Sequence, residues 1–104
     1  MLDLREKDRD RICRIAEECF TEPIEIWAYG SRVNGESHDA SDLDLVVRGR
    51  DLEPVKNDAL YNFKEALRDS TIPILVQVLD WASIPETFRR DILQNEHEAL
   101  FTSL

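Results

Sequence analysis

The sequence contains few of the residues that build disulfide-rich, membrane-spanning or polyanion-binding proteins. Its 104 residues include only 2 Cys, 3 Gly and 4 Pro, and 13 Lys and Arg stand against 22 Asp and Glu, for a formal net charge of −9. The longest aliphatic run is Ile74-Leu75-Val76, whereas a membrane span needs about 18 apolar residues. An acidic chain is also a poor non-specific ligand for nucleic acids, because their phosphates require clustered Lys and Arg. We therefore expect neither a membrane segment nor a direct nucleic-acid template.

The cysteines, histidines and first residues bear on the compartment of the protein. Cys13 and Cys19 are six residues apart in a predicted helix, a rise of about 9 Å that a disulfide does not bridge. The chain has no Cys-x-x-Cys pair, and His38 and His97 are isolated in polar surroundings, which is typical of solvated surface residues. The first residues, Met-Leu-Asp-Leu-Arg-Glu-Lys-Asp, lack the apolar stretch of a signal peptide. We expect free thiols, a reducing compartment and a cytoplasmic protein.

Length and patterning predict a single α/β domain over residues 1–104. A hydrophobic fraction of 42% with 34% charged residues is typical of a globular protein, and a chain of this length supports one small core. No internal repeat, low-complexity tract or linker interrupts it. Apolar residues recur first with a helical and then with a strand period. The predicted helices are 5–20, 54–67 and 83–94, and the predicted strands of a small sheet are 24–29, 42–48 and 74–79.

Local signals place the ends of these elements and part of the core. Pro54 is expected to open the middle helix, since proline is favoured in a first helical turn. Ser83 with Glu86 three residues later is a capping-box signature and predicts the start of the last helix. Trp27 and Tyr29 share one face of a predicted strand, and we expect them in the core.

The segment that carries chemistry joins the first two predicted strands. Gly30-Ser31 is followed by ten residues and then by Asp42-x-Asp44. Glycine lets a backbone N–H approach a phosphate closely, and the Ser31 hydroxyl can hold a phosphate oxygen. Asp42 and Asp44 are two apart on a strand, so both carboxylates project from one face. Such a pair suits Mg²⁺, which takes oxygen ligands and keeps substrate phosphates in its shell, and it predicts phosphoryl transfer.

Three stretches resemble a known family. Trp-Ala-Tyr-Gly-Ser-Arg-Val-Asn-Gly at 27–35 and Ser-Asp-Leu-Asp-Leu at 41–45 resemble the minimal nucleotidyltransferases of the DNA polymerase β superfamily. Leu-Asp-Trp-Ala-Ser-Ile at 79–84 is similar to the branch in which the small protein is the antitoxin of a HEPN-domain toxin in two-gene bacterial modules. The resemblance implies a mixed sheet flanked by helices, Mg²⁺ and ATP as cofactors, and transfer of AMP to a hydroxyl. In that branch the hydroxyl is a tyrosine of the partner toxin.

The resemblance also implies a role for individual positions. Nucleotide binding falls to Gly30, Ser31, Arg32 and Ser41, and metal binding and catalysis fall to Asp42 and Asp44. Arg32 matches the Gly-Ser-Arg form of the family and could meet a phosphate. The alternative for Arg32 is a solvated side chain at the edge of the loop.

One position departs from the family pattern. A third carboxylate normally stands three residues before the aspartate of the Leu-Asp-Trp segment, and here that position is Gln77. An amide neither acts as a general base nor supplies negative charge to a metal. Asp80 is nearby, but a separation of three on a strand directs it to the opposite face unless a bulge or the strand end reorients it.

Two functions therefore remain open. The first is an enzyme that adenylylates its partner. The second is a catalytically impaired binding module with the nucleotidyltransferase fold, which neutralises its partner by contact. For either we expect Mg-ATP binding, with transfer slowed or abolished by Gln77.

Overall fold

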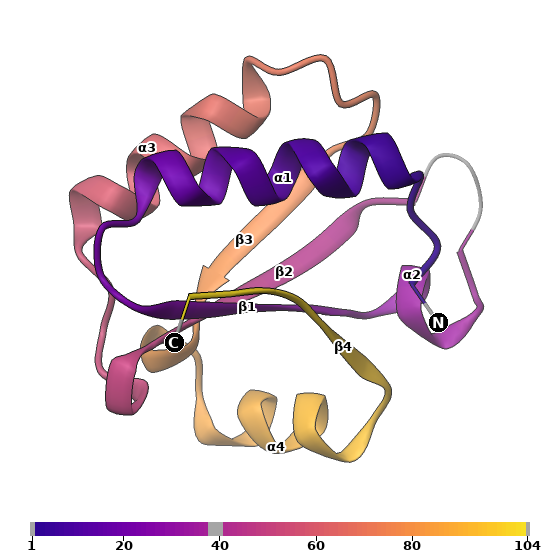
Figure 1. Cartoon of the computed structure of the whole chain (residues 1–104). Helices are drawn as coiled ribbons and strands as arrows, with labels where there is room; N and C mark the ends of the chain where they lie inside the picture. Colours follow the sequence, from indigo (N-terminus) through magenta and orange to yellow (C-terminus); the bar gives the residue numbers. More distant parts are fainter. Residues whose placement is uncertain (1, 38–40, 104) are drawn as a thin grey trace.

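The computed structural model describes residues 2–37 and 41–103, which form a four-stranded sheet with helices on both sides (Figure 1). In chain order the elements are α1 (Glu6–Cys19), β1 (Ile24–Tyr29), α2 (Ser31–Asn34), β2 (Leu43–Gly49), η1 (Arg50–Leu52), α3 (Asn57–Arg68), β3 (Val76–Asp80), η2 (Trp81–Ser83), α4 (Glu86–Gln94) and β4 (His97–Thr102). None of the helices described is both long enough and apolar enough to cross a membrane. His38 lies outside the described residues.

The sheet is mixed, with the strand order β3-β2-β1-β4. β1 pairs antiparallel with β2 and β4, and β2 pairs parallel with β3. Helices α1 and α3 cover one face and α4 covers the other, as Figure 1 shows. The expected small mixed sheet flanked by helices is confirmed.

The alternation of side chains divides the apolar residues between the two faces of the sheet. The larger cluster fills the face under α1 and α3, where the fully buried Phe63 lies 5.2 Å from the ring of Phe20. The smaller cluster lies under α4 and combines Val46, Trp81, Ile84 and Ile92 with the partly buried Trp27, Tyr29 and Leu79. The prediction that Trp27 and Tyr29 lie in the core is met in part, because both pack against this cluster and are only partly buried.

Two sequence predictions about local structure are wrong, and one strand is missing from the predictions. Helix α3 begins at Asn57, because Lys56, the residue before it, still has extended backbone angles. The predicted capping box fails because Pro85 precedes α4 directly, and Ser83 lies in the separate turn η2. A proline also holds the residue before it in an extended conformation, so the helix does not start earlier. Strand β4 was not predicted at all.

His97 is not the solvated residue that its polar neighbours suggested. Its ring stacks on Trp27, with centroids 4.5 Å apart and planes inclined by 18°, and its Nδ1 lies 3.0 Å from the carbonyl oxygen of Ile92. Cys13 and Cys19 are free thiols, as predicted.

Candidate functional site

Two carboxylates lie together where β2 begins. Asp42 directly precedes β2, and Asp44 pairs with Tyr29 of β1 on one side and with Gln77 of β3 on the other. Burial and the negative charge of Asp42 raise the pKa of the half-buried Asp44 carboxyl. This shift reflects repulsion between two carboxylates and the loss of water around one of them, and a bound cation would relieve both.

Gln77 reaches the same carboxylates from the neighbouring strand. Its Nε2 donates a hydrogen bond of 2.8 Å to Oδ2 of Asp42, while its backbone position is opposite Asp44. The side chains of Asp42, Asp44 and Gln77 therefore share one face of the sheet. Within residues 2–37 and 41–103, no group of three or more His, Cys, Asp and Glu side chains could hold a metal ion.

Two carboxylates still fit a magnesium site. Mg²⁺ is commonly held by one or two protein carboxylates, with water and substrate phosphates in the remaining positions. The burial of Asp44 and its repulsion from Asp42 make positive charge favourable beside these carboxylates.

Asp80 is not brought to this site. It pairs with Val47, on the face opposite to Gln77, and is 7% exposed. Its Oδ1 accepts a hydrogen bond from the backbone N–H of Ala82, at 3.1 Å, and its Oδ2 accepts one from Val55, at 3.3 Å. Asp80 therefore caps η2 and anchors the segment before α3, and no bulge turns it towards Asp42.

Gly30 lies against Asp44 at the end of β1. Its backbone angles, φ +85° and ψ −157°, are rarely adopted by other residues, and a Cβ on it would lie only 2.7 Å from Oδ2 of Asp44. The carbonyl of Gly30 accepts hydrogen bonds from Val33 and Asn34, so the chain turns at once into α2, with Ser31 as its first residue. Gly30 is thus placed beside Asp44, and Ser31 follows it directly in the chain.

A hollow of about 400 Å³ adjoins Gly30. It is lined by Tyr29, Gly30, Asn34, Asp91, Ile92, Asn95 and Glu96. Burial and the charge of Asp44 raise the pKa of Tyr29 to about 12, so its phenol stays protonated at neutral pH. The α4 residues in this lining carried no signal in the sequence, because only tertiary packing brings the end of α4 to β1.

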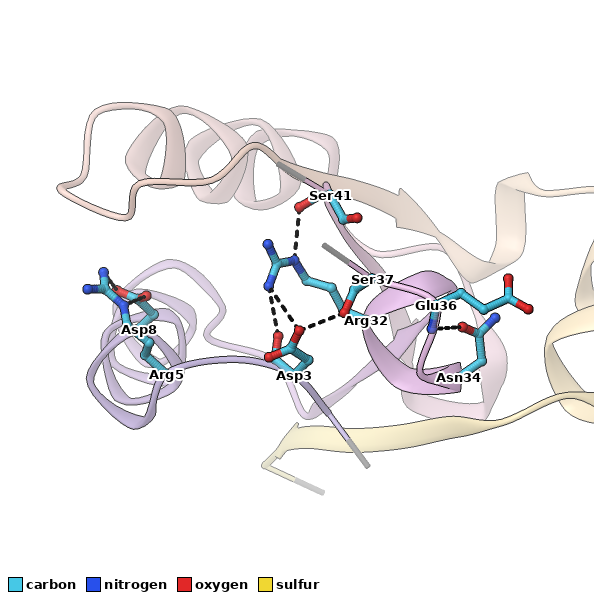
Figure 2. A network of polar contacts seen from close by, with 8 residues as sticks. All are labelled: Asp3, Arg5, Asp8, Arg32, Asn34, Glu36, Ser37 and Ser41. Atoms are coloured by element: carbon cyan, nitrogen blue, oxygen red, sulfur yellow. Dashed lines mark hydrogen bonds and ion pairs between the residues drawn. The ribbon is translucent and has the colours of Figure 1, made fainter. Parts of the chain in front are cut away.

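Arg32 is not the solvated side chain that one of the two sequence expectations described (Figure 2). It is 7% exposed, its Nε donates 2.9 Å to the carbonyl oxygen of Ser41, and its Nη1 donates 2.9 Å to the carbonyl oxygen of Asp3. The guanidinium is therefore not solvated, because burial pairs it with backbone carbonyls, and its contact with a phosphate stays a prediction. Ser41 is half-buried and directly precedes Asp42, and its carbonyl oxygen accepts the hydrogen bond from Arg32.

Known proteins match this chain in sequence and in fold. Residues 11–102 match the family described as polymerase beta, nucleotidyltransferase. A stretch of 67 residues, 64% of this chain, is 43% identical to the probable protein adenylyltransferase MntA of Haemophilus influenzae. The match spans 57% of that relative, little more than half of its length.

Two solved structures share the fold. A crystal structure of a toxin-antitoxin with AMP-PNP has a TM-score of 0.71 at 19% identity, over 89% of this chain and 72% of that one. A protein from Shewanella oneidensis has a TM-score of 0.68 at 14% identity, over 93% of this chain and 71% of that one. Because the family match covers residues 11–102, most of the sequence, the chain belongs to the polymerase beta nucleotidyltransferase family.

Proposed function

We propose that this protein is a nucleotidyltransferase that binds ATP with Mg²⁺ and transfers AMP to a hydroxyl of a partner protein. The observation that carries the proposal is the pair Asp42 and Asp44 on one face of the sheet at the start of β2, with Asp44 close to Gly30. The name of the relative, a probable protein adenylyltransferase, supports a protein acceptor. The AMP-PNP of the structural neighbour supports an adenine nucleotide.

Each residue of the site has a proposed task. Gly30 and Ser31 would hold the triphosphate, since the absence of a Cβ leaves room at the turn into α2. Asp42 and Asp44 would hold Mg²⁺, which when bound neutralises phosphate charge and polarises the reacting phosphoryl group. Arg32 and Ser41 would contribute by shaping the loop that ends at Asp42.

The transfer makes one bond and breaks one. The acceptor oxygen bonds to the α-phosphorus of ATP, the bond from that phosphorus to the bridging oxygen breaks, and pyrophosphate leaves with the electron pair. The hydroxyl proton has to leave the acceptor oxygen. Of the three side chains that meet at this point, Asp42 and Asp44 can accept it and the Gln77 amide cannot.

We propose a HEPN-domain toxin as the partner and a tyrosine as the acceptor, with this protein as the antitoxin. The relative MntA and the toxin-antitoxin description of the structural neighbour support a toxin partner. A net charge of −9 would complement a basic partner surface and steer the encounter. The reaction would take place in the cytoplasm, where ATP is available and Cys13 and Cys19 stay reduced.

One observation favours a second candidate, a binding module that neutralises its partner without modifying it. Gln77 occupies the neighbouring strand position and donates to Asp42, so that carboxylate is engaged by a neutral amide. Two carboxylates bring less negative charge to bound metal ions than three carboxylates would. Loss of the third should weaken chiefly the metal that activates the acceptor, which would slow transfer while leaving nucleotide binding intact.

Transfer of label from α-labelled ATP with Mg²⁺ separates the candidates. The wild type, Gln77→Asp and Asp44→Asn are each co-expressed with the protein encoded by the adjacent gene, as the candidate HEPN partner, and assayed side by side. Label on the partner with the wild type, lost in Asp44→Asn, supports the enzyme. Label with Gln77→Asp alone supports the binding module, and no label with any variant contradicts AMP transfer by this scaffold.

A further inference from the structure

Hydrogen bonds connect the N-terminal segment, at Asp3, with Arg32 and Ser37 near the loop that ends at Asp42. We infer that Arg32 is a positioning residue that, together with Asp3, holds the Asp42 carboxylate in place for metal and nucleotide binding. This inference rests on the proposed function. We refer to Asp3, Arg32, Ser37 and Ser41 as the clamp, and Figure 2 shows their contacts.

The clamp connects three parts of the chain. Arg32 donates from Nε to the Ser41 carbonyl and from Nη1 to the Asp3 carbonyl, both at 2.9 Å, and the N–H of Asp3 donates back to the carbonyl of Arg32 at 2.6 Å. The carboxylate of Asp3 accepts a 2.6 Å hydrogen bond from the Ser37 hydroxyl and lies 3.9 Å from Arg32 Nη1. Residues on both sides of 38–40 are thus tied to one buried guanidinium.

The contact with Ser41 acts directly on Asp42. The Ser41 carbonyl belongs to the same planar peptide group as the Asp42 nitrogen. The hydrogen bond that it accepts from Arg32 therefore fixes the orientation of the peptide plane directly before the Asp42 Cα. On the other side of Asp42, the N–H of Leu43 donates to the carbonyl of Leu75 at 2.9 Å. The backbone of Asp42 is therefore held on both sides, and Arg32 supplies one of the two restraints.

Asp3 is a firm support because its neighbour is anchored to the sheet. Leu2 is 8% exposed, and its N–H donates 3.2 Å to the carboxylate of Glu98 on β4. Arg9 of α1 holds the same carboxylate at 2.8 Å and, through this hydrogen bond, lowers the pKa of Glu98. The segment before α1 is thus fixed to β4, and through Asp3 it supports Arg32 and the loop that ends at Asp42.

The arrangement requires arginine and not merely positive charge. The guanidinium presents several donors in a fixed planar fork, which can serve two carbonyls in different directions. A lysine ammonium is a compact charge on a flexible stem and cannot hold both Asp3 and Ser41 in the same geometry. Arg32→Lys therefore keeps the charge and loses the clamp.

A second arginine provides a matched control. Arg89 also donates to two backbone carbonyls, from Nε to Trp81 at 2.9 Å and from Nη2 to Ala82 at 3.0 Å. These carbonyls lie beyond the end of β3 that is remote from Gln77. Arg89→Lys thus disrupts a comparable contact away from Asp42.

Two measurements on the full chain test the inference: titration with Mg-ATP, and hydrogen exchange of the backbone amides of Asp42 and Leu43. Arg32→Lys is expected to weaken Mg-ATP binding by about 10- to 100-fold, the usual range for outer partners of metal ligands. It should also speed exchange at these two amides more than in the rest of the chain. Arg89→Lys should change neither the affinity nor the exchange at these positions.

Several results would overturn the inference. One is wild-type affinity in Arg32→Lys, and another is exchange that rises uniformly or not at all. If the wild type itself binds no Mg-ATP, the proposed function fails, and local exchange still decides whether Arg32 holds Asp42. Should Arg32→Lys not fold, Arg32→Gln serves instead, because its shorter side chain cannot donate to the carbonyls of both Asp3 and Ser41. Weaker Mg-ATP binding in this variant supports the clamp, and unchanged binding overturns it.

Discussion

Replacing Gly30 by alanine tests how closely the backbone approaches Asp44. At φ +85° and ψ −157°, a residue with a Cβ is strained by about 1–3 kcal/mol. The new Cβ would also lie 2.7 Å from Oδ2 of Asp44, so the carboxylate has to rotate away from its position in the site. Because that oxygen ends a side chain that can rotate, we expect backbone strain to dominate, and the free energy of unfolding to fall by about 2 kcal/mol. Mg-ATP binding should be lost, since one of two carboxylates is displaced.

Gly35 provides the control for this change. It also has a positive φ, +87°, but a Cβ there meets no atom within 4 Å, so Gly35→Ala should cost only the strain of the left-handed conformation, about 1–2 kcal/mol. Urea and thermal unfolding measure both costs, and 1 kcal/mol corresponds to about 4–8 °C in Tm for a domain of this size. Titration with Mg-ATP completes the comparison. Undiminished nucleotide binding in Gly30→Ala, or equal losses of binding in the two variants, would refute the close contact with Asp44 as a functional feature.

The remaining predictions concern Asp44, a stacked arginine and the core. The raised pKa of Asp44 means that the folded state holds this proton more tightly than the unfolded state, so the wild type loses stability as the pH rises from the usual carboxyl range through the raised pKa. Asp44→Asn should therefore be more stable than the wild type at neutral pH and lose this advantage in acid, as urea unfolding at several pH values can show. Arg48→Met removes a guanidinium whose Cζ lies 3.9 Å from the ring centroid of Trp27 and 4.7 Å from that of Trp81. The free energy of unfolding should fall by about 1–2 kcal/mol, and the tryptophan emission should shift. Unchanged emission would argue against the stacking. Phe63→Ala empties a fully buried position and should cost about 3–5 kcal/mol, seen as a lower urea midpoint at constant m.

Elements with strong periodicity were predictable from the sequence. The strand predicted at 24–29 coincides with β1, and the helix predicted at 5–20 extends one residue beyond α1 at each end. Strand alternation also placed Asp42 and Asp44 on one face, and the contacts of both with Gln77 agree with this placement. The same alternation directed Asp80 to the opposite face, where it lies.

Features that depend on tertiary contacts were not predictable. Strand β4 contains Glu98 and Ala99, residues with low strand preference, and it is defined by pairing with β1 across a register shift. The stacking of His97 on Trp27 follows from that pairing. The buried Arg32 donates to the carbonyl of Asp3, 29 residues away in sequence, and no local pattern encodes such a contact.

Calorimetric titration of the protein with ATP, with and without Mg²⁺, tests the central claim most directly. The claim is that Asp42 and Asp44 form a cation-dependent nucleotide site beside Gly30. The wild type should bind ATP only when Mg²⁺ is present, and Asp44→Asn, which keeps the size of the side chain and removes its charge, should lose that binding. No binding by the wild type, or equal binding by Asp44→Asn, would contradict the claim.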